Sequence, residues 1–460
     1  MGDLPAGPDA VRGRRVLVGD ELVPATVLID RGVVTGIEPY DHPVDGLVLE
    51  APEPAYVLPG VVDTHVHVNE PGRTEWEGFE TGTTAALLGG VTTLIDMPLN
   101  SVPPTTTVAG LRAKQAAARD RVAVDVGFWG GAVPGNLDEL EPLWAAGVMG
   151  FKCFLSPSGV EEFGHLDADQ LTAAMREVAR LDALLVVHAE DPAVLDRAPA
   201  RPGPAYADFL ASRPDEAETA AIAQVVRTAR ETGARVHLLH LSSARALDLV
   251  ADAKAEGLAL TAETCPHYLC LAAETIPDGD GAFKCCPPIR DEGNRDALWA
   301  ALLDGVIDVV VTDHSPATVA EKTRGGGDLQ QAWGGIAGLQ VGFTAVAHEA
   351  RLRGIGIEQV SRWMSQGTAD LVGLGGEGGE GGEGLDRKGR IAVGADADLV
   401  LFDPDAEQVV DAARLAHRNP VSAYDGRRLT GRVVQTVVRG RTDGPDHRWG
   451  RQLTRRSNSR

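Results

Sequence analysis

The stretch Leu58-Pro-Gly-Val-Val-Asp-Thr-His-Val-His67 is an apolar, β-type run that ends in a His-x-His pair. Side chains alternate between the two faces of a strand, so His65 and His67 point the same way and can bind one metal ion or a pair of ions. Such a pair also arises by chance in a chain with 12 histidines, so its meaning depends on the segments that follow.

Eight β-type runs alternate with Ala-rich amphipathic segments along the middle of the chain. The runs span Val61–Val68, Thr92–Met97, Val122–Trp129, Val148–Phe154, Leu184–Glu190, Val236–Ser242, Leu258–Cys265 and Val306–Ser315. The segments 166–181, 216–232 and 294–303 carry the helical pattern. This alternation predicts an α/β fold, a (β/α)8 TIM barrel. A doubly wound sheet is the alternative, but no Gly-x-Gly-x-x-Gly motif opens the first helix.

Both ends of the chain differ from this middle part. Segments 15–57 and 389–438 show short alternating strands, and we expect them to build one small β-sandwich domain from both chain ends. The predicted organisation is the N-terminal part of the sandwich (1–57), a metal-dependent barrel (58–374), a Gly/Glu-rich surface loop (375–388), the C-terminal part of the sandwich (389–445) and a basic tail (446–460). We expect the tail to be frayed and solvated.

The composition argues against nucleic acid and membranes as partners. The formal net charge is −23 with a pI near 4.9, and Lys and Arg form no basic stripe before the last few residues. The five cysteines form no Cys-x-x-Cys pair, which favours a reducing compartment over a disulfide frame. No signal-type leader and no run of 18 apolar residues occur, so we expect a soluble, cytoplasmic protein.

Side chains that typically bind metals recur where the predicted strands end. In a barrel, the active site lies at the C-terminal ends of the strands. Strands one, five, six and eight end in histidines or an aspartate, and a lysine lies inside strand four. The predicted metal ligands are His65, His67, Lys152, His188, His240 and Asp313.

Lys152 lies within the apolar stretch Gly150-Phe-Lys-Cys-Phe154. A buried, unpaired ammonium is costly, so this lysine must be paired, neutral or modified. Carbamylation by CO₂ would turn the amine into an anion, N6-carboxylysine, with two oxygens able to bridge two divalent cations. A side chain that extends to the barrel mouth is the alternative. The four histidines favour the modified ligand.

Strand alternation separates the two histidines of strand six. His240 shares a face with Val236 and Leu238, whereas His237 points to the opposite face. We therefore expect His237 to face the helices and to be structural.

Two divalent cations held by these ligands would generate hydroxide at neutral pH and polarise a carbonyl group, which predicts a hydrolase. Asp313 would bind one ion, accept the proton of the bridging water and deliver it to the departing nitrogen. Its alternative role is a helix N-cap. Zinc suits these ligands, as do cobalt, manganese and iron, and we expect zinc first.

The assembled motifs resemble the amidohydrolase superfamily and, within it, the cyclic amidohydrolases. Pro59-Gly-Val-Val-Asp-Thr-His-Val-His67 is similar to the family's first-strand signature, Phe151-Lys152 to its carboxylated lysine, and Gly389-Arg-Ile-Ala-Val-Gly-Ala-Asp-Ala-Asp-Leu-Val400 to its sandwich signature. The resemblance covers residues 15 to about 440. It implies a barrel with a β-sandwich, two metal ions on a carboxylated lysine, and a homo-oligomer, commonly a tetramer.

Departures from the family patterns favour one branch. Dihydroorotases usually carry an arginine directly after the His-x-His pair, where this chain has Val68-Asn-Glu70. Hydantoinases and dihydropyrimidinases usually place a tyrosine where this chain has Pro157, to stabilise the developing oxyanion. The stretches that begin at Glu70, Asp96 and Trp333 look instead like those of allantoinases.

The resemblance to allantoinases implies hydrolysis of the ring amide of allantoin to allantoate, with this small molecule as the partner. A hydantoinase-like hydrolase of other cyclic ureides is the alternative, and a non-catalytic scaffold is a remote one. The resemblance also implies substrate contacts at Asn100, Cys286 and Gly334, although Asn100 alternatively forms a turn. We expect Arg73 and Arg290 to pair with carboxylates.

Overall fold

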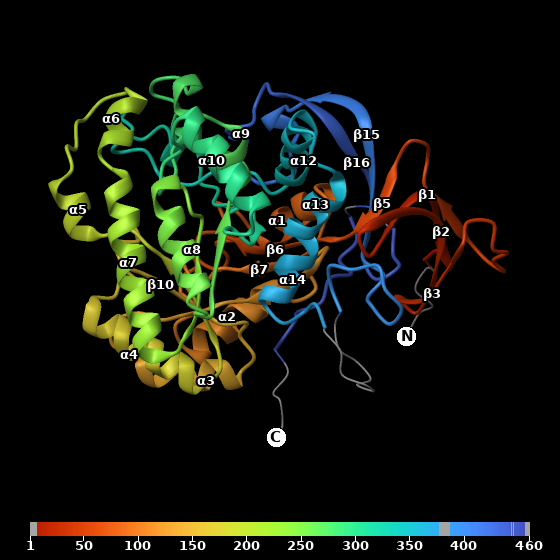
Figure 1. Ribbon diagram of the computed structural model, residues 1–460, viewed down its shortest axis with the longest axis horizontal. Helices are drawn as coiled ribbons and strands as arrows, with labels where there is room; N and C mark the ends of the chain where they lie inside the picture. Colours follow the sequence, from red (N-terminus) through yellow and green to blue (C-terminus); the bar gives the residue numbers. More distant parts are fainter. Residues whose placement is uncertain (1–6, 377–386, 443, 445, 456–460) are drawn as a thin grey trace.

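The computed structural model describes residues 7–376, 387–442, 444 and 446–455. The predicted Gly/Glu-rich loop therefore lies outside the described residues over 377–386. Figure 1 shows a body of strands and helices formed by the middle of the chain, beside a strand-rich part formed by its two ends.

The body contains two sheets whose strands pair in parallel and follow the chain order. One sheet holds β6 (Val61–Val66), β7 (Val91–Asp96) and β8 (Asp125–Phe128); the other holds β9 (Gly130–Gly131), β10 (Phe151–Phe154), β11 (Leu184–His188), β12 (Arg235–Leu238), β13 (Leu260–Thr264) and β14 (Val309–Val310). Each predicted strand overlaps an observed one. Only Trp129 separates β8 from β9, and Val66 bridges to His314 beyond β14, so the two sheets adjoin at both ends.

Helices surround these strands (Figure 1). They are α1 (Phe79–Leu88), α2 (Val108–Ala118), α3 (Leu140–Ala145), α4 (Ala168–Arg180), α5 (Pro192–Arg197), α6 (Tyr206–Ala211), α7 (Asp215–Thr232), α8 (Leu247–Ala255), α9 (Pro266–Cys270), α10 (Glu292–Leu303), α11 (Val319–Lys322), α12 (Gly342–Leu352), α13 (Ile357–Ser361) and α14 (Gly367–Leu371). Helices α4, α7 and α10 match the three predicted segments. In α4, Asp167 and Gln170 form a capping box, and a stripe that includes Leu171 and Val178 is buried.

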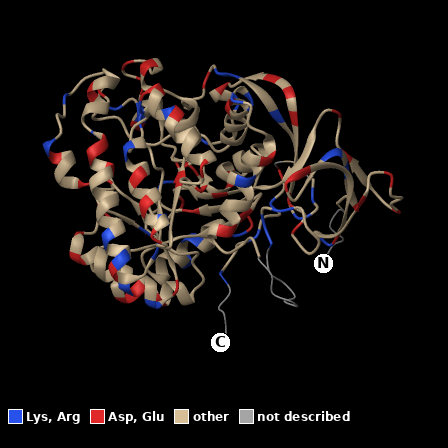
Figure 2. Ribbon diagram, viewed as in Figure 1, with Lys and Arg blue, Asp and Glu red and all other residues tan. Residues whose placement is uncertain are grey.

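Acidic and basic residues are interspersed along these helices (Figure 2). Among the residues that the structure describes, none of the helices is long and apolar enough to cross a bilayer.

Strands from the two chain ends are neighbours in one seven-stranded sheet. Its order is β16-β15-β5-β1-β2-β3, with β4 paired to β1. The strands span β1 (Ala10–Val18), β2 (Glu21–Asp30), β3 (Val33–Pro39), β4 (Val48–Glu50), β5 (Tyr56–Pro59), β15 (Leu399–Val409) and β16 (Arg428–Val437). Antiparallel pairing of β15 with β5 joins the two ends just before the His-x-His strand β6 begins, so this sheet anchors the start of the site.

A buried cluster of charges connects this sheet to the body. Lys388 Nζ lies 2.6 to 2.7 Å from carboxylate oxygens of Asp125, Asp396 and Asp398. Burial raises the pKa of Asp125, but Lys388 and Arg439 outweigh it and hold that pKa at about 2. Because breaking a buried ion pair typically costs about 3–5 kcal/mol, this cluster is a strong link between β8 and the start of β15.

The basic tail is ordered over 446–455, so the prediction of a frayed, solvated tail is wrong for these residues. Gln452 bridges to Val126 of β8, and Leu453 is 2% exposed. The backbone N–H of Arg451 donates to Asp125 Oδ1 at 2.9 Å. The tail docks because Leu453 joins a buried apolar cluster and Arg451 places its guanidinium 3.6 Å from the buried carboxylate of Asp125.

Candidate metal centre

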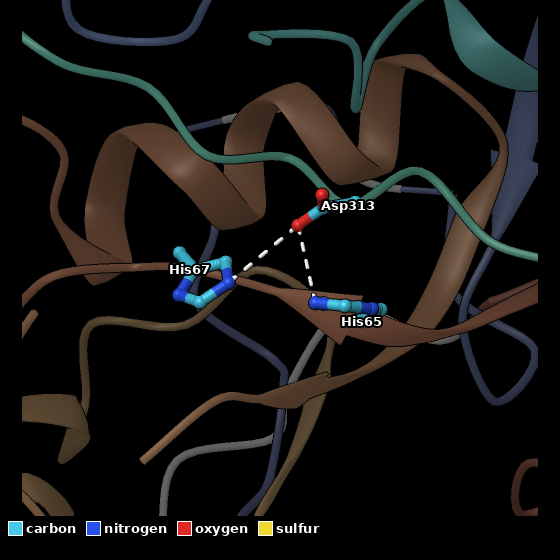
Figure 3. A group of neighbouring side chains, drawn as sticks. All are labelled: His65, His67 and Asp313. Carbon is cyan, nitrogen blue, oxygen red and sulfur yellow. Dashed lines mark ion pairs between the residues drawn. The ribbon is translucent and has the colours of Figure 1, made fainter. Parts of the chain in front are cut away.

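Three predicted ligands meet at one point inside the body (Figure 3). Asp313 Oδ1 lies 3.1 Å from His65 Nε2 and 3.5 Å from His67 Nε2. Their ligand atoms all lie within 4.8 Å of one another, and all three residues are buried. Lys152 joins them, because its Nζ lies 3.3 Å from His65 Nε2.

The other two predicted ligands form a second half of the cluster. His188 Nδ1 lies 3.0 Å from His240 Nε2, and the ring of Phe154 stacks on His188 at 4.5 Å. His65 and His240 link the halves, with ring centroids 5.5 Å apart. The structure thus brings together all six predicted ligands, and five of them line one cavity of about 300 Å³: His67, Lys152, His188, His240 and Asp313.

Left-handed backbone conformations aim two of these side chains. His240 has φ +35° and Asp313 has φ +44°, both rare for residues other than glycine. Each lies just beyond the end of its strand, β12 or β14. Near Asp313, Thr312 donates through its backbone N and Oγ1 to Asp63 instead of continuing the ladder, which explains why β14 is so short.

The prediction that His237 faces the helices is wrong. His237 Nε2 contacts Glu263 Oε2 at 2.9 Å, and Glu263 Oε1 also bonds His65 Nδ1 at 2.5 Å. His237 therefore belongs to the polar network beneath the cluster. The prediction assumed a regular strand from Val236 to His240. The left-handed backbone of His240 breaks that regularity, so His240 does not share the face of Val236 and Leu238.

Buried glutamates orient two of the imidazoles. The Nδ1–H of His65 donates to Glu263, which leaves Nε2 with its lone pair towards Asp313. The Nε2–H of His188 donates to Glu190 Oε2 at 2.8 Å, which leaves Nδ1 towards His240. Carboxylates that fix the tautomer of histidines in this way are a regular feature of metal sites. Sequence analysis missed both glutamates; the available signal was an acidic residue within an apolar strand or two positions after a ligand.

Burial favours the neutral forms of the basic groups of the cluster. It lowers the pKa of His67 to about 3, with a further contribution from Lys152, and lowers the pKa values of His188 and His240. Burial also lowers the pKa of Lys152 to about 8, although Asp313 raises it. Neutral imidazoles bind metals and a neutral amine reacts with CO₂, so the donor set fits divalent cations.

His267, to which the sequence assigned no role, lies next to the cluster. Its ligand atoms, with those of Cys265 and Asp313, form another set within 4.8 Å. Burial lowers the pKa of His267 to about 4, and neither ring nitrogen has a hydrogen-bond partner in the described part of the chain. This imidazole packs against the ring of Tyr268, with ring centroids 4.2 Å apart, and lies close to Asp313.

The three predicted substrate contacts lie on the wall of the same cavity: Asn100, Cys286 and Gly334. Asn100 Nδ2 is 3.5 Å from His67 Nδ1, and its φ of +65° places its backbone in the left-handed region. Arg73 and Arg290 pair with Glu162 and Glu218 at 2.5 and 2.6 Å, which confirms their predicted pairing.

A sequence model of the amidohydrolase family matches residues 56–442. The chain belongs to the amidohydrolase family. Within that family it is 53% identical over 431 residues to "Allantoinase" of Streptomyces avermitilis, covering 94% of each chain. It is 44% identical over 397 residues to "Allantoinase" of Saccharomyces cerevisiae, covering 85% of this chain and 83% of the relative.

Among solved structures, the fold is similar to "L-Hydantoinase (Dihydropyrimidinase)" from Arthrobacter aurescens, with a TM-score of 0.89 and 30% identity. The match covers 98% of this chain and 100% of the hydantoinase chain. Family membership therefore agrees with the resemblance found in the sequence motifs, and the similarity extends through both the body and the end sheet.

Buried neutral histidines make the metal-free protein sensitive to acid. The pKa of His67 is about 3 and those of His267 and His417 are about 4, all lowered by burial, whereas an unfolded chain titrates near 6.5. Between these values the unfolded state binds more protons, so the free energy of unfolding should fall as the pH falls, by up to about 1.4 kcal/mol per pH unit for each histidine. Urea unfolding of chelator-treated protein between about pH 7 and 5 tests this.

The variant His417→Gln is the matched control, because it removes one titrating group that lies outside the ligand cluster. Its unfolding free energy should depend less steeply on pH. A metal-free protein whose stability is constant or rises on acidification over this range would contradict the buried, neutral state of these rings.

Proposed function

We propose that this chain is a metal-dependent hydrolase that opens the hydantoin ring of allantoin at a ring amide to give allantoate. The observation that carries the proposal is the cluster of four imidazoles, one carboxylate and a buried lysine, five of which line one cavity together with the predicted substrate contacts. The allantoinases of Streptomyces avermitilis and Saccharomyces cerevisiae support the choice of substrate, since the similarity spans most of each chain.

We further propose that the parallel strands close into a (β/α)8 barrel and that the end sheet folds as a β-sandwich, with domains at 1–57, 58–374 and 389–445. The bridge between Val66 and His314 and the short step from β8 to β9 support closure. In such a barrel the ligands lie at the C-terminal ends of the strands, where active sites of this fold are found.

His65, His67 and Asp313 would hold one divalent cation, His188 and His240 the other, and a carboxylated Lys152 would join them. Such a pair of ions lowers the pKa of a water molecule and polarises the carbonyl group under attack. We propose zinc for both positions, with cobalt, manganese or iron as alternatives, because imidazole and carboxylate ligands suit each of these metals.

The protein groups supply proton transfer and orientation. Asp313 uses Oδ1 towards the two histidines, and Figure 3 shows its other oxygen pointing away from both rings. That second oxygen is available to take the proton of the attacking water and to pass it to the departing ring nitrogen. Asn100, Cys286 and Gly334 would position the ring from the cavity wall, where Gly334 lies beside the Cys286 thiol.

A hydantoinase-like hydrolase of other cyclic ureides is the second candidate, because the Arthrobacter aurescens L-hydantoinase is structurally similar. Pro157 lines the cavity at the position where the hydantoinase resemblance calls for tyrosine. Without that phenol the oxyanion donor expected of a hydantoinase is missing, which favours allantoin. We also propose a homotetramer in the cytoplasm, the location resting on five free cysteines.

Turnover of racemic allantoin tests the function directly. Protein purified with added divalent metal and bicarbonate should form allantoate and should prefer allantoin strongly over hydantoin and dihydrouracil. The metal-free protein is the control and should be inactive. Activity on hydantoin or dihydrouracil alone would favour the second candidate and would contradict our interpretation of Pro157.

The variant Lys152→Ala tests the carboxylated lysine. It should retain the fold but lose most of its bound metal and activity, because no anion remains to join the two ions. Formate or acetate should restore part of the activity by supplying a carboxylate, and the same acids should leave the parent enzyme unaffected. Full activity of Lys152→Ala without added acid would rule out the two-metal proposal.

The variant Asp313→Asn tests proton transfer. The amide keeps the shape and one ligand oxygen but cannot accept the proton, so kcat should fall by about 10²-fold or more, with a smaller change in KM. Circular dichroism and metal analysis of the purified variant control for folding and loading. An activity within a few-fold of the parent would assign the proton transfer to another group.

A further inference from the structure

We propose that Arg213 is a positioning residue for His188 and that it acts through Glu190. The inference rests on the metal centre proposed above, in which His188 is a ligand, and it assigns a role to an arginine for which the sequence motifs gave none. The argument depends on an uninterrupted chain of hydrogen bonds from the cavity wall to the imidazole.

Glu190 is the central member of this chain. Its Oε2 accepts from His188 Nε2 at 2.8 Å and from Arg213 Nη2 at 2.8 Å, and its Oε1 accepts from Arg213 Nε at 3.1 Å. The guanidinium therefore grips the carboxylate with two parallel bonds, a geometry that fixes the orientation of the acid as well as neutralising it. Without Arg213, the charge of Glu190 would be buried beside a neutral ring, since Glu190 is 1% exposed.

The orientation of Glu190 determines which nitrogen of His188 carries the proton. As long as the carboxylate accepts from Nε2, the lone pair stays on Nδ1, which faces His240 Nε2 at 3.0 Å. A rotated or protonated acid would release the ring, and a ring misdirected by a fraction of an ångström binds a cation less well. Arg213 is thus connected to the predicted second ion without touching it.

Arg213 is itself held in place from the helical layer. It lies in the segment just before α7, and its carbonyl oxygen accepts from Arg290 Nη2 at 3.4 Å, while Arg290 also bonds Glu218 of α7 at 2.6 Å. The side chain of Arg213 is 20% exposed and lines the cavity, whereas its partner Glu190 is almost fully covered. The arginine therefore closes the wall between the cavity and the buried glutamate.

The variant Arg213→Met removes both bonds while keeping the length of the side chain. Arg324→Met is the matched control, because Arg324 lines the same cavity and pairs with Glu321 but contacts no predicted ligand. Both proteins are loaded with Co²⁺, and the loss of cobalt to a chelator is followed together with the visible absorption of the bound ion. We expect Arg213→Met to release one of its two cobalt ions about 10–100-fold faster than the parent, and its spectrum to change. Arg324→Met should match the parent in both readouts.

Equal cobalt retention and unchanged spectra in Arg213→Met and the parent would overturn the proposal. So would a raised KM with unaltered metal release, which would mean that Arg213 contacts the substrate directly. Arg213→Lys and Glu190→Gln guard against a misfolded methionine variant: each keeps part of the hydrogen-bonded chain and should show an intermediate release rate. Because release and absorption are measured without substrate, failure of the parent to hydrolyse allantoin would refute the proposed function and leave this test intact.

Discussion

One buried carboxylate, Glu263, holds several groups of the candidate centre in position through hydrogen bonds. Its Oε1 accepts from His65 Nδ1 at 2.5 Å and from the backbone N–H of His240 at 3.1 Å, and its Oε2 accepts from His237 Nε2 at 2.9 Å. One acid thus orients the ring of one predicted ligand and the backbone of another, from strand β13, which supplies no predicted ligand. Because Glu263 is 1% exposed, each of these donors also compensates the cost of burying its charge.

The convergence of the ligands depends on strands that stop early. β12 ends at Leu238 and β14 at Val310, and the left-handed residues His240 and Asp313 follow within three positions. Left-handed backbone is unfavourable for side chains other than glycine, so the surrounding hydrogen bonds must hold it. Here the backbone N–H of His240 bonds Glu263, and Asp63 takes the donors of Thr312 next to Asp313. The unfavourable backbone conformations of His240 and Asp313 thus place both side chains on the wall of the cavity.

Local sequence patterns were sufficient for the strands and the main helices, and they selected six side chains that the structure brings together, because period-two alternation and side-chain chemistry can be recognised within a few residues. They were insufficient where a partner lies far along the chain. His237 was misplaced because alternation assumes a regular strand, and the positive φ of His240 breaks it. The docked tail could not be foreseen, since Arg451 meets Asp125 across 326 positions. Glu190 was missed although it follows the predicted ligand His188 by two positions; the arginine that grips it lies 23 positions further along the chain.

A comparison among the buried lysines gives the strongest support for a modified Lys152. Lys114 and Lys388 each bond aspartates, and Lys284 and Lys322 donate to backbone carbonyl oxygens. For Lys152, no carboxylate or carbonyl partner occurs among the described residues; its nearest polar neighbour is the ring nitrogen of His65, with the Phe154 ring at 5.0 Å. The other four lysines each have oxygen acceptors for the side-chain amine, whereas Lys152 has none among the described residues. Burial lowers the pKa of Lys322 to about 8, as it does for Lys152, so the missing acceptor and not the pKa sets Lys152 apart. An amine without an acceptor contributes little to the stability of a buried strand. Its neutral form, however, reacts with CO₂. The resulting carbamate anion would supply the negative charge that the proposed pair of cations among these imidazoles needs.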